Sequence, residues 1–341
     1  MGLSMISRFW IGTSILAAVG TTLAGTALAQ RAGNRLEMFR ELRQRTEQLQ
    51  DKLPADPNPT PIARPGDYRF SFQYDGVTRE YLVHVPASYR PGKPTPVLMA
   101  LHGGGGDDAF QADDSKYKLI SKSEQAGFIA VFPNGYSRFK NGMLATWNAG
   151  RCCGGAQKTN SDDVGFLREV IRRVERQASI DPRKVFAAGM SNGAMMSWRL
   201  ACEAPEVRAI APVEGTDNTT ACRPSHPVAV IEFHSLDDNH VPFNGGKGDL
   251  SVAQVDFTSV AASQSKWVAI DHADPAAKRV LTVPGAHCDL HPAKPGGAPV
   301  ELCVTDTGGH SWAGGGTQQG RLQPSTAISA NDLMWNFFSS L

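Results

Sequence analysis

A pentapeptide, Gly-Met-Ser-Asn-Gly at residues 189–193, constrains the fold of this chain more than any other segment. It lies between the apolar run Lys184–Ala188 and the helix-like segment Ala194–Leu200. Strand, sharp turn and helix in this order form a nucleophile elbow, where glycines let a strained serine turn pack closely. The pattern predicts that Ser191 is a nucleophile. The chain contains 34 glycines, so this five-residue pattern is weak evidence by itself. The prediction needs support from other catalytic motifs in the sequence.

Short apolar runs alternate with helical stretches from residue 67 to the end of the chain. Such alternation predicts an α/β fold with a mostly parallel sheet and helices on both faces, here without a large cap domain. The helices that we predict are Asp163–Gln177, Ala194–Cys202 and Ala327–Phe338. The apolar runs that we predict as strands are 81–85, 97–101, 128–132, 184–188, 209–213 and 228–233.

The N-terminal residues 1–29 have the pattern of a secretory signal. A short segment ending in Arg8 is followed by an apolar stretch, Phe9–Gly25, and by the small-residue motif Ala27–Ala29. This pattern predicts cleavage before Gln30 and a secreted or periplasmic protein. The alternative is a membrane anchor, which the glycines and threonines within the apolar stretch disfavour.

Three further predictions concern the organisation of the chain. Residues 34–53 carry apolar side chains at helical spacing among charged ones, which predicts an amphipathic surface helix rather than a coiled coil. Prolines over residues 54–61 end this helix and favour an extended linker, so that residues 30–66 form a helix and a linker. We expect the catalytic domain at residues 67–341.

The charge balance argues against two classes of partner. The sequence has 34 lysines and arginines against 33 acidic residues, and removal of the predicted signal takes away only Arg8, so that 33 of each sign remain. A zero formal charge without a basic cluster does not favour nucleic acid or an anionic membrane surface. The oligomeric state stays open.

Six cysteines in an exported chain predict disulfides before metal ligands. Proximity along the sequence suggests two pairs and leaves two neighbours: Cys202–Cys222, Cys288–Cys303, and Cys152 with Cys153. Zinc is not favoured, because the chain has no Cys-x-x-Cys spacing and its histidines do not cluster with the cysteines. We expect neither a metal nor another cofactor.

A nucleophilic serine needs a base within hydrogen-bond reach and a third group that orients the base. His310 follows Gly308-Gly309 after the last apolar run, and a histidine downstream of serine and acid is the chain order of hydrolases with this elbow. The acid is expected after the strand 228–233, where Asp237 and Asp238 both qualify. Residue types and chain order leave that choice open.

The segment His102–Gly106 directly follows the strand 97–101, and its glycines let backbone N–H groups approach a substrate. Acyl transfer to a serine needs such donors for the developing oxyanion, and we predict Gly104 and Asn192 for this role. A glycine run can also be a flexible turn or a phosphate cradle. Phosphate binding is not expected, because the segment lacks both the Lys-Ser/Thr ending and the dinucleotide glycine spacing.

Six phrases carry a resemblance to a known family: Val83–Pro86, Leu101–Gly103, Thr146–Gly150 with Cys152-Cys153, Asp162–Phe166, Gly189–Met196 and Gly308–Trp312. Over residues 67–341 the chain is similar to secreted esterases of the polyhydroxybutyrate depolymerase and feruloyl esterase type, which have the α/β-hydrolase fold. In such proteins the acid stands three positions before Val-Pro-Tyr/Phe, which selects Asp238. The resemblance implies hydrolysis of carboxylic esters by Ser191, His310 and Asp238 through an acyl-enzyme.

The resemblance implies feruloyl-type or related plant-polymer esters as substrates, with polyhydroxybutyrate or short hydroxyalkanoate esters as the alternative. A function of another class is a non-catalytic binding protein, which the complete set of triad residue types disfavours. The chain departs from the family pattern at two places: it has His234-Ser235-Leu236 where the family has His-Gly-Thr, and Ala313 where proline is common. We expect these changes to affect the shape of the substrate pocket and not the fold or the triad. Polymer-degrading relatives often carry a further binding module, whereas this sequence ends at Leu341, so we expect soluble or small esters.

Two tryptophans are implied near the site by the same resemblance. Trp147 and Trp312 would there bind an aromatic acyl group by stacking. The alternative is ordinary core packing, because large aromatic side chains are mostly buried.

Overall fold

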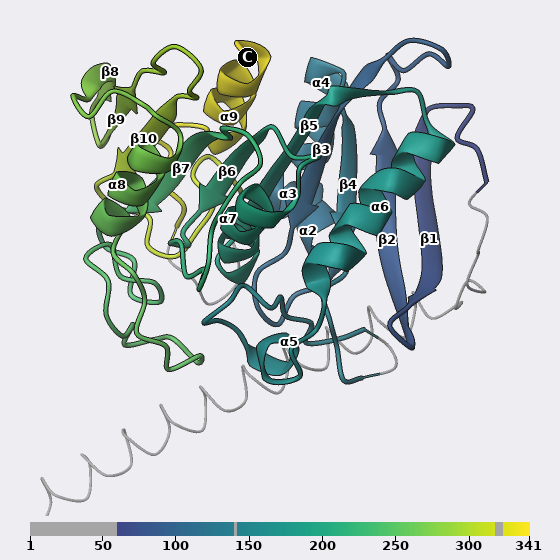
Figure 1. Ribbon diagram of the computed structural model, residues 1–341, viewed down its shortest axis with the longest axis horizontal. Coiled ribbons are helices and arrows are strands. Elements are labelled where there is room, and N and C mark those ends of the chain that lie inside the picture. The colour runs from purple at the N-terminus through teal and green to yellow at the C-terminus, as the bar shows by residue number, and fades with distance from the viewer. Residues whose placement is uncertain (1–59, 140–141, 318–322) are drawn as a thin grey trace, which may run out of the picture. The chain divides into compact units, whose positions relative to one another are not determined.

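The computed structural model describes residues 60–139, 142–317 and 323–341 (Figure 1). The predicted signal, amphipathic helix and most of the proline-rich linker therefore lie outside the described residues.

A ten-stranded mixed sheet forms the centre of the fold, in the order β1-β2-β4-β3-β5-β6-β7-β10-β9-β8. From β4 to β10 in this order neighbouring strands run parallel, while β1, β2, β9 and β8 pair in antiparallel fashion at the two edges. The strands are β1 (Gly66–Tyr74), β2 (Val77–Val85), β3 (Thr95–Leu101), β4 (Ile129–Pro133), β5 (Ile180–Met190), β6 (Ala209–Val213), β7 (Ala229–Ser235), β8 (Lys278–Val283), β9 (Ala286–His291) and β10 (Val300–Thr305).

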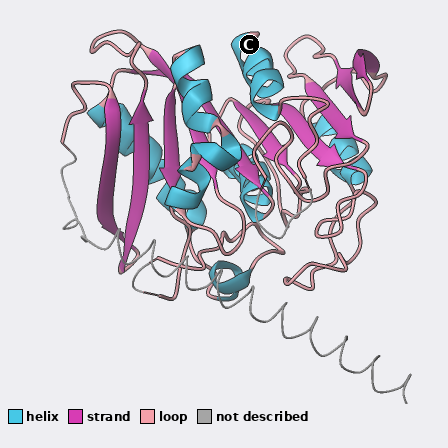
Figure 2. Ribbon diagram, turned by 180° about the vertical axis from the view of Figure 1, so that it is seen from behind, coloured by secondary structure: helices cyan, strands magenta, loops and turns pink. Residues whose placement is uncertain are grey.

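Helices cover both faces of this sheet, and Figures 1 and 2 show the two faces from opposite sides. One face is covered by α6, α7 and α8, and the other by α4 and α9. The described helices are α2 (Asp108–Ala112), α3 (Asp114–Tyr117), α4 (Leu119–Ala126), α5 (Gly154–Lys158), α6 (Asp163–Gln177), α7 (Asn192–Glu203), α8 (Val260–Ile270) and α9 (Ala330–Ser339).

Alternating side chains of the buried strands supply two separate hydrophobic cores. In β3, Val97, Met99 and Leu101 pack into the core beneath α6 and α7, whereas Leu98 and Ala100 pack into the core beneath α9. This follows from the pleat of a strand, which points successive side chains to opposite faces. The predicted fold class, a mostly parallel sheet with helices on both faces, is confirmed.

Helix termini agree with the local capping chemistry. The Asp162 side chain accepts a hydrogen bond from the Gly165 N–H and so begins α6 where the sequence predicts it. The last helix begins at Ala330, three residues later than predicted from residue 327, because the Ser329 side chain caps it by accepting from the Asp332 N–H. None of the helices in the described ranges is long and apolar enough to cross a membrane.

The last residues of the predicted linker pack against the domain. Ile62 is buried in the core, and its N–H donates to the Gln177 carbonyl at 2.7 Å. The Tyr89 hydroxyl donates to the Ile62 carbonyl at 3.4 Å. Packing therefore begins several residues before residue 67, where we placed the start of the catalytic domain.

Candidate active site

Ser191 lies in the turn between β5 and α7, with a φ of 57° and a ψ of −119°. A positive φ is strained for a residue with a side chain, which is the backbone geometry of a nucleophile elbow. Close packing explains the flanking glycines: a Cβ on Gly189 would collide with the Gly193 backbone, and one on Gly193 would collide with the Leu101 carbonyl. The Ser191 side chain is half-buried at the carboxyl end of the parallel strands.

Asp238 and His310 are brought together from the loops after β7 and β10, which are neighbouring parallel strands. The His310 Nδ1 donates to Asp238 Oδ2 at 2.7 Å, and both side chains are buried. The second oxygen of Asp238 accepts from the backbone N–H groups of His240 at 2.7 Å and Val241 at 3.0 Å. This arrangement orients the imidazole and leaves its Nε2 as the nitrogen that can accept a proton.

Charge and hydrogen bonding keep Asp238 ionised. Burial by itself raises the pKa of the Asp238 carboxyl, but the charge of His310 and the hydrogen bond from its ring outweigh burial. The pKa of Asp238 therefore lies well below its ordinary value. A carboxylate in this position can stabilise the imidazolium that forms when His310 takes up a proton.

Asp237, the competing aspartate, contacts the same loop at a different point. Its Oδ1 accepts from the Gly309 N–H at 2.7 Å and from the Ser235 hydroxyl at 2.5 Å. The two neighbouring aspartates thus have different roles, since Asp238 binds the His310 ring and Asp237 binds the backbone N–H of the preceding residue, Gly309.

A third residue of this turn, His240, was not singled out by the sequence. Its half-buried ring stacks on that of His310, with centroids 4.6 Å apart and an interplanar angle of 14°. No motif marks this position, because the contact depends on the way the turn after β7 folds back over the His310 loop.

The glycine loop after β3 is anchored by the buried His102. Its Nδ1 donates to the Gly103 carbonyl at 2.8 Å, and its Nε2 accepts from the Gly135 N–H at 2.9 Å. Burial lowers the pKa of His102 to about 4, so the ring is neutral at physiological pH and Nε2 is free to accept. The sequence placed His102 in the loop without assigning it this anchoring role.

The loop and the elbow meet at the two predicted oxyanion donors. A Cβ placed on Gly104 would lie 3.5 Å from the Asn192 Cβ. Among the described residues, neither the Gly104 N–H nor the Asn192 N–H donates to a backbone carbonyl. Gly104 thus lies beside Asn192, the residue that follows Ser191, and an oxyanion site needs N–H groups that are not engaged by backbone carbonyls.

Trp147 and Trp312 are both buried, with exposed fractions of 0% and 1%. The Trp147 indole N–H donates to the His102 carbonyl at 2.9 Å, and the Trp312 indole N–H donates to Asn331 Oδ1 at 3.0 Å. Burial and these hydrogen bonds favour the alternative, core packing, over the expectation that the rings stack on a substrate. Trp147 still contacts the elbow through its backbone. Its N–H donates to Asn192 Oδ1 at 2.7 Å, and its carbonyl accepts from Asn192 Nδ2 at 3.0 Å.

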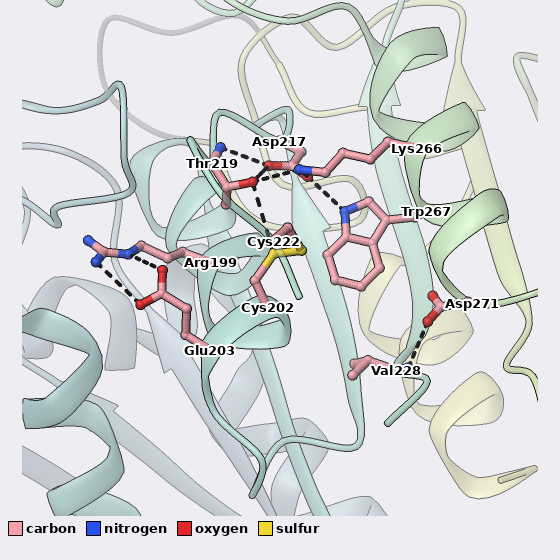
Figure 3. Close-up of a disulfide and its surroundings, with 10 residues drawn as sticks. All are labelled: Arg199, Cys202, Glu203, Asp217, Thr219, Cys222, Val228, Lys266, Trp267 and Asp271. Atoms are coloured by element: carbon pink, nitrogen blue, oxygen red, sulfur yellow. Dashed lines mark hydrogen bonds and ion pairs between the residues drawn. A yellow bond between two sulfur atoms is a disulfide. The ribbon is translucent and has the colours of Figure 1, made fainter. Parts of the chain in front are cut away.

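Disulfides join the cysteines in the two pairs that sequence proximity suggested, and the remaining neighbours, Cys152 and Cys153, are joined to each other. Figure 3 shows the Cys202–Cys222 disulfide, which ties α7 to the loop after β6. Asp217 lies nearby in that loop, paired with Lys266 at 2.6 Å.

Three groups of described residues bring metal-ligating atoms within 4.8 Å of one another: Asp238 with His240 and His310, Glu214 with His234 and Asp238, and Cys288 with Glu301 and Cys303. In the first group the Asp238–His310 hydrogen bond already occupies ligand atoms, and in the third both sulfurs are bonded in a disulfide. The second group is fully buried and shares Asp238 with the Asp238–His310 pair.

Comparisons with known proteins agree with this architecture. A family model described as "Putative esterase" matches residues 76–213. Feruloyl esterase B of Piromyces equi is 27% identical over 244 residues, which is 68% of this chain and 42% of that protein. Feruloyl esterase C of Emericella nidulans is 31% identical over 173 residues, which is 49% of this chain and 58% of that protein. The chain spans about half the length of these curated relatives.

Among solved structures, an acetyl xylan esterase from Aspergillus awamori aligns with a TM-score of 0.54 at 15% identity, covering 80% of this chain and 100% of that one. The likeness and the strand order define an α/β-hydrolase fold. Over residues 76–213 the chain is similar to the esterase family that the matching model describes, and feruloyl esterases are among the proteins that it resembles.

Proposed function

We propose that this protein is a serine esterase that hydrolyses carboxylic esters through an acyl-enzyme on Ser191. The observation that carries the proposal is the buried hydrogen bond between His310 and Asp238 at the sheet edge that also holds the strained Ser191. The match of residues 76–213 to a family model of esterases supports the same reaction class.

In this mechanism the Ser191 hydroxyl attacks the ester carbonyl while His310 Nε2 takes its proton. Asp238 stabilises the imidazolium, and the N–H groups of Gly104 and Asn192 donate to the oxyanion. Each such donor contributes about 2.7–4 kcal/mol to the transition state. The imidazolium protonates the departing alcohol, and a water activated by the same imidazole then hydrolyses the acyl-enzyme.

For the substrate we propose feruloyl or related plant-polymer esters, with short hydroxyalkanoate esters as the second candidate. The names of the relatives, feruloyl esterases B and C, favour the first. Because Trp147 and Trp312 are buried, an aromatic acyl group would have to be recognised by other side chains. Export across a membrane is proposed from the N-terminal pattern and is compatible with the disulfides.

A fluorophosphonate probe tests the nucleophile directly. The wild-type protein should be labelled on Ser191, and Ser191→Ala should lose both labelling and ester hydrolysis. Ser197→Ala is the matched control, because Ser197 lies on α7 and its hydroxyl, among the described residues, donates to the Gly193 carbonyl at 3.0 Å. Absence of labelling and of hydrolysis in the wild type would instead support the non-catalytic binding protein.

Substrate class is tested by comparing kcat/KM for methyl ferulate, para-nitrophenyl esters of increasing chain length and hydroxybutyrate oligomers. The feruloyl proposal requires the highest value for methyl ferulate among esters of similar leaving-group reactivity. A preference for the oligomers would select the alternative.

A further inference from the structure

A second buried carboxyl group lies behind the proposed catalytic acid. Glu214 directly follows β6, and Asp238 lies three residues after the end of β7. These strands are parallel neighbours with Val213 opposite Phe233. The Glu214 N–H donates to the Phe233 carbonyl at 2.9 Å. Because parallel strands end at the same edge of a sheet, this topology sets the Glu214 side chain against the turn that carries Asp238.

Both carboxyl groups are removed from water. Glu214 and Asp238 have exposed fractions of 3% and 4%. Each Glu214 oxygen lies 3.1 Å from the Ser235 N–H, which is a single donor, and a Glu214 oxygen lies within 4.8 Å of an Asp238 oxygen. Two buried carboxylates this close together repel each other strongly unless one of them holds a proton.

The neighbouring histidine does not remove this conflict. His234 Nε2 lies 3.6 Å from Glu214 and 3.7 Å from Asp238, but it donates its hydrogen bond to the Val241 carbonyl at 2.8 Å. On the other side of the ring, Nδ1 lies 3.7 Å from the buried Glu232. A charged His234 would therefore balance only one of three buried carboxylates.

The proton between the two carboxyls belongs on Glu214. Asp238 accepts two backbone N–H donors and the His310 ring, all of which stabilise its anionic form, whereas Glu214 accepts from one backbone N–H. Burial raises the pKa of Glu214, and the negative charges of Asp238 and Asp237 raise it further above its ordinary value.

We propose that Glu214 is a positioning residue of the triad, which remains protonated at neutral pH and donates a hydrogen bond to the Asp238 carboxylate. This bond adds a second side-chain partner to the carboxylate besides His310 and delocalises part of its charge. Asp238 then holds the proton of His310 less tightly, so the base is available at lower pH. The inference rests on the proposed function only for its effect on rate, because the protonation of Glu214 can be measured without turnover.

The variant Glu214→Gln separates a protonated acid from a carboxylate. A glutamine amide has the same shape and can donate to Asp238 as the protonated acid does. We expect kcat and the acidic limb of the pH profile of Glu214→Gln to match the wild type. Glu214→Ala removes the donor, and should lower kcat about tenfold with little change in KM, as for loss of a hydrogen bond to a charged group. Its acidic limb should move to higher pH.

Infrared difference spectroscopy tests the proton itself, even if Glu214→Ala fails to fold. The spectrum of wild type minus Glu214→Gln at neutral pH should show the carbonyl band of a protonated carboxylic acid. Absence of this band overturns the proposal, as does a pH profile of Glu214→Gln that shifts like that of Glu214→Ala, or a Glu214→Ala protein with unchanged kcat and profile. Fluorophosphonate labelling of the wild type distinguishes these outcomes from failure of the esterase assignment.

Discussion

The two loop regions that would enclose a bound ester are held together by different chemistry. Around the glycine loop, His102 and Trp147 make hydrogen bonds between neutral groups. Around the turn after β7, Asp237, Asp238 and Glu214 make bonds that involve ionisable carboxyls. Neutral anchors can hold oxyanion donors in place at any working pH, whereas proton transfer requires groups that titrate. The comparison leads us to expect that only the second region sets the response to pH.

The largest effect is expected within the ionisable region. Asp238→Asn should lower kcat about 10⁴-fold, because an amide no longer stabilises the imidazolium or holds the correct tautomer. Asp237→Asn should lower kcat about tenfold or less, because its amide oxygen can still accept from the Gly309 N–H. Steady-state kinetics on a para-nitrophenyl ester measures both. If the two variants rank the other way, Asp237 is the orienting acid.

The pH profile of the wild type is the second test. His310 must be neutral to take the serine proton, so kcat/KM should rise with pH in a single step near neutrality and fall about tenfold per pH unit below it. Asp238 adds no step there, because its pKa lies well below its ordinary value and it stays ionised. Two separate rising steps between about pH 5 and pH 9 would contradict control by a single base.

A smaller effect, without any shift in pH, is expected in the neutral region. His102→Asn keeps a donor near Gly103 but loses the acceptor for the Gly135 N–H, so the glycine loop should loosen and kcat should fall about tenfold. Since His102 has a pKa of about 4, its removal should leave the profile near neutrality unchanged. His226→Asn is the control, because the hydrogen bonds of the His226 ring within the described ranges are those with the carbonyls of Pro205 and Pro227. A shifted pH profile of kcat/KM for His102→Asn would contradict the expectation that only the region around the turn after β7 sets the response to pH.

The smallest effect on catalysis is expected from the disulfides, which lie outside both regions. Replacing Cys202 and Cys222 by serine opens a loop with a sequence separation of 20, and should cost about 3 kcal/mol of unfolding free energy. We expect kcat to stay within about twofold of the wild type, because neither cysteine contacts the proposed triad. Urea denaturation and kinetics of the same variant measure the two quantities. Mass spectrometry of the non-reduced exported protein should find the linked peptides, and free thiols would refute the pairing.

Much of the fold was predictable because its central strands are continuous apolar runs. Each predicted run overlaps one of the strands from β2 to β7, and Asp163–Gln177 is the observed α6. The strands β1, β8 and β9 were not among the predicted runs. Strand β8, for example, consists mostly of residues exposed at the sheet edge and shows no apolar run. Its hydrogen bonds with β9 define it, and those depend on a partner strand rather than on its own sequence.

The local features of the site can be recognised in the amino-acid sequence. Ser191 and its glycines are recognisable because the elbow needs small residues within the same five positions, and His310 follows from chain order. Three properties became clear from the folded chain: which aspartate holds the His310 ring, that the tryptophans are buried, and that Glu214 lies close to Asp238. They arise where loops after different strands meet at one edge of the sheet. Residues far apart in the chain become neighbours there, and burial then decides their charge.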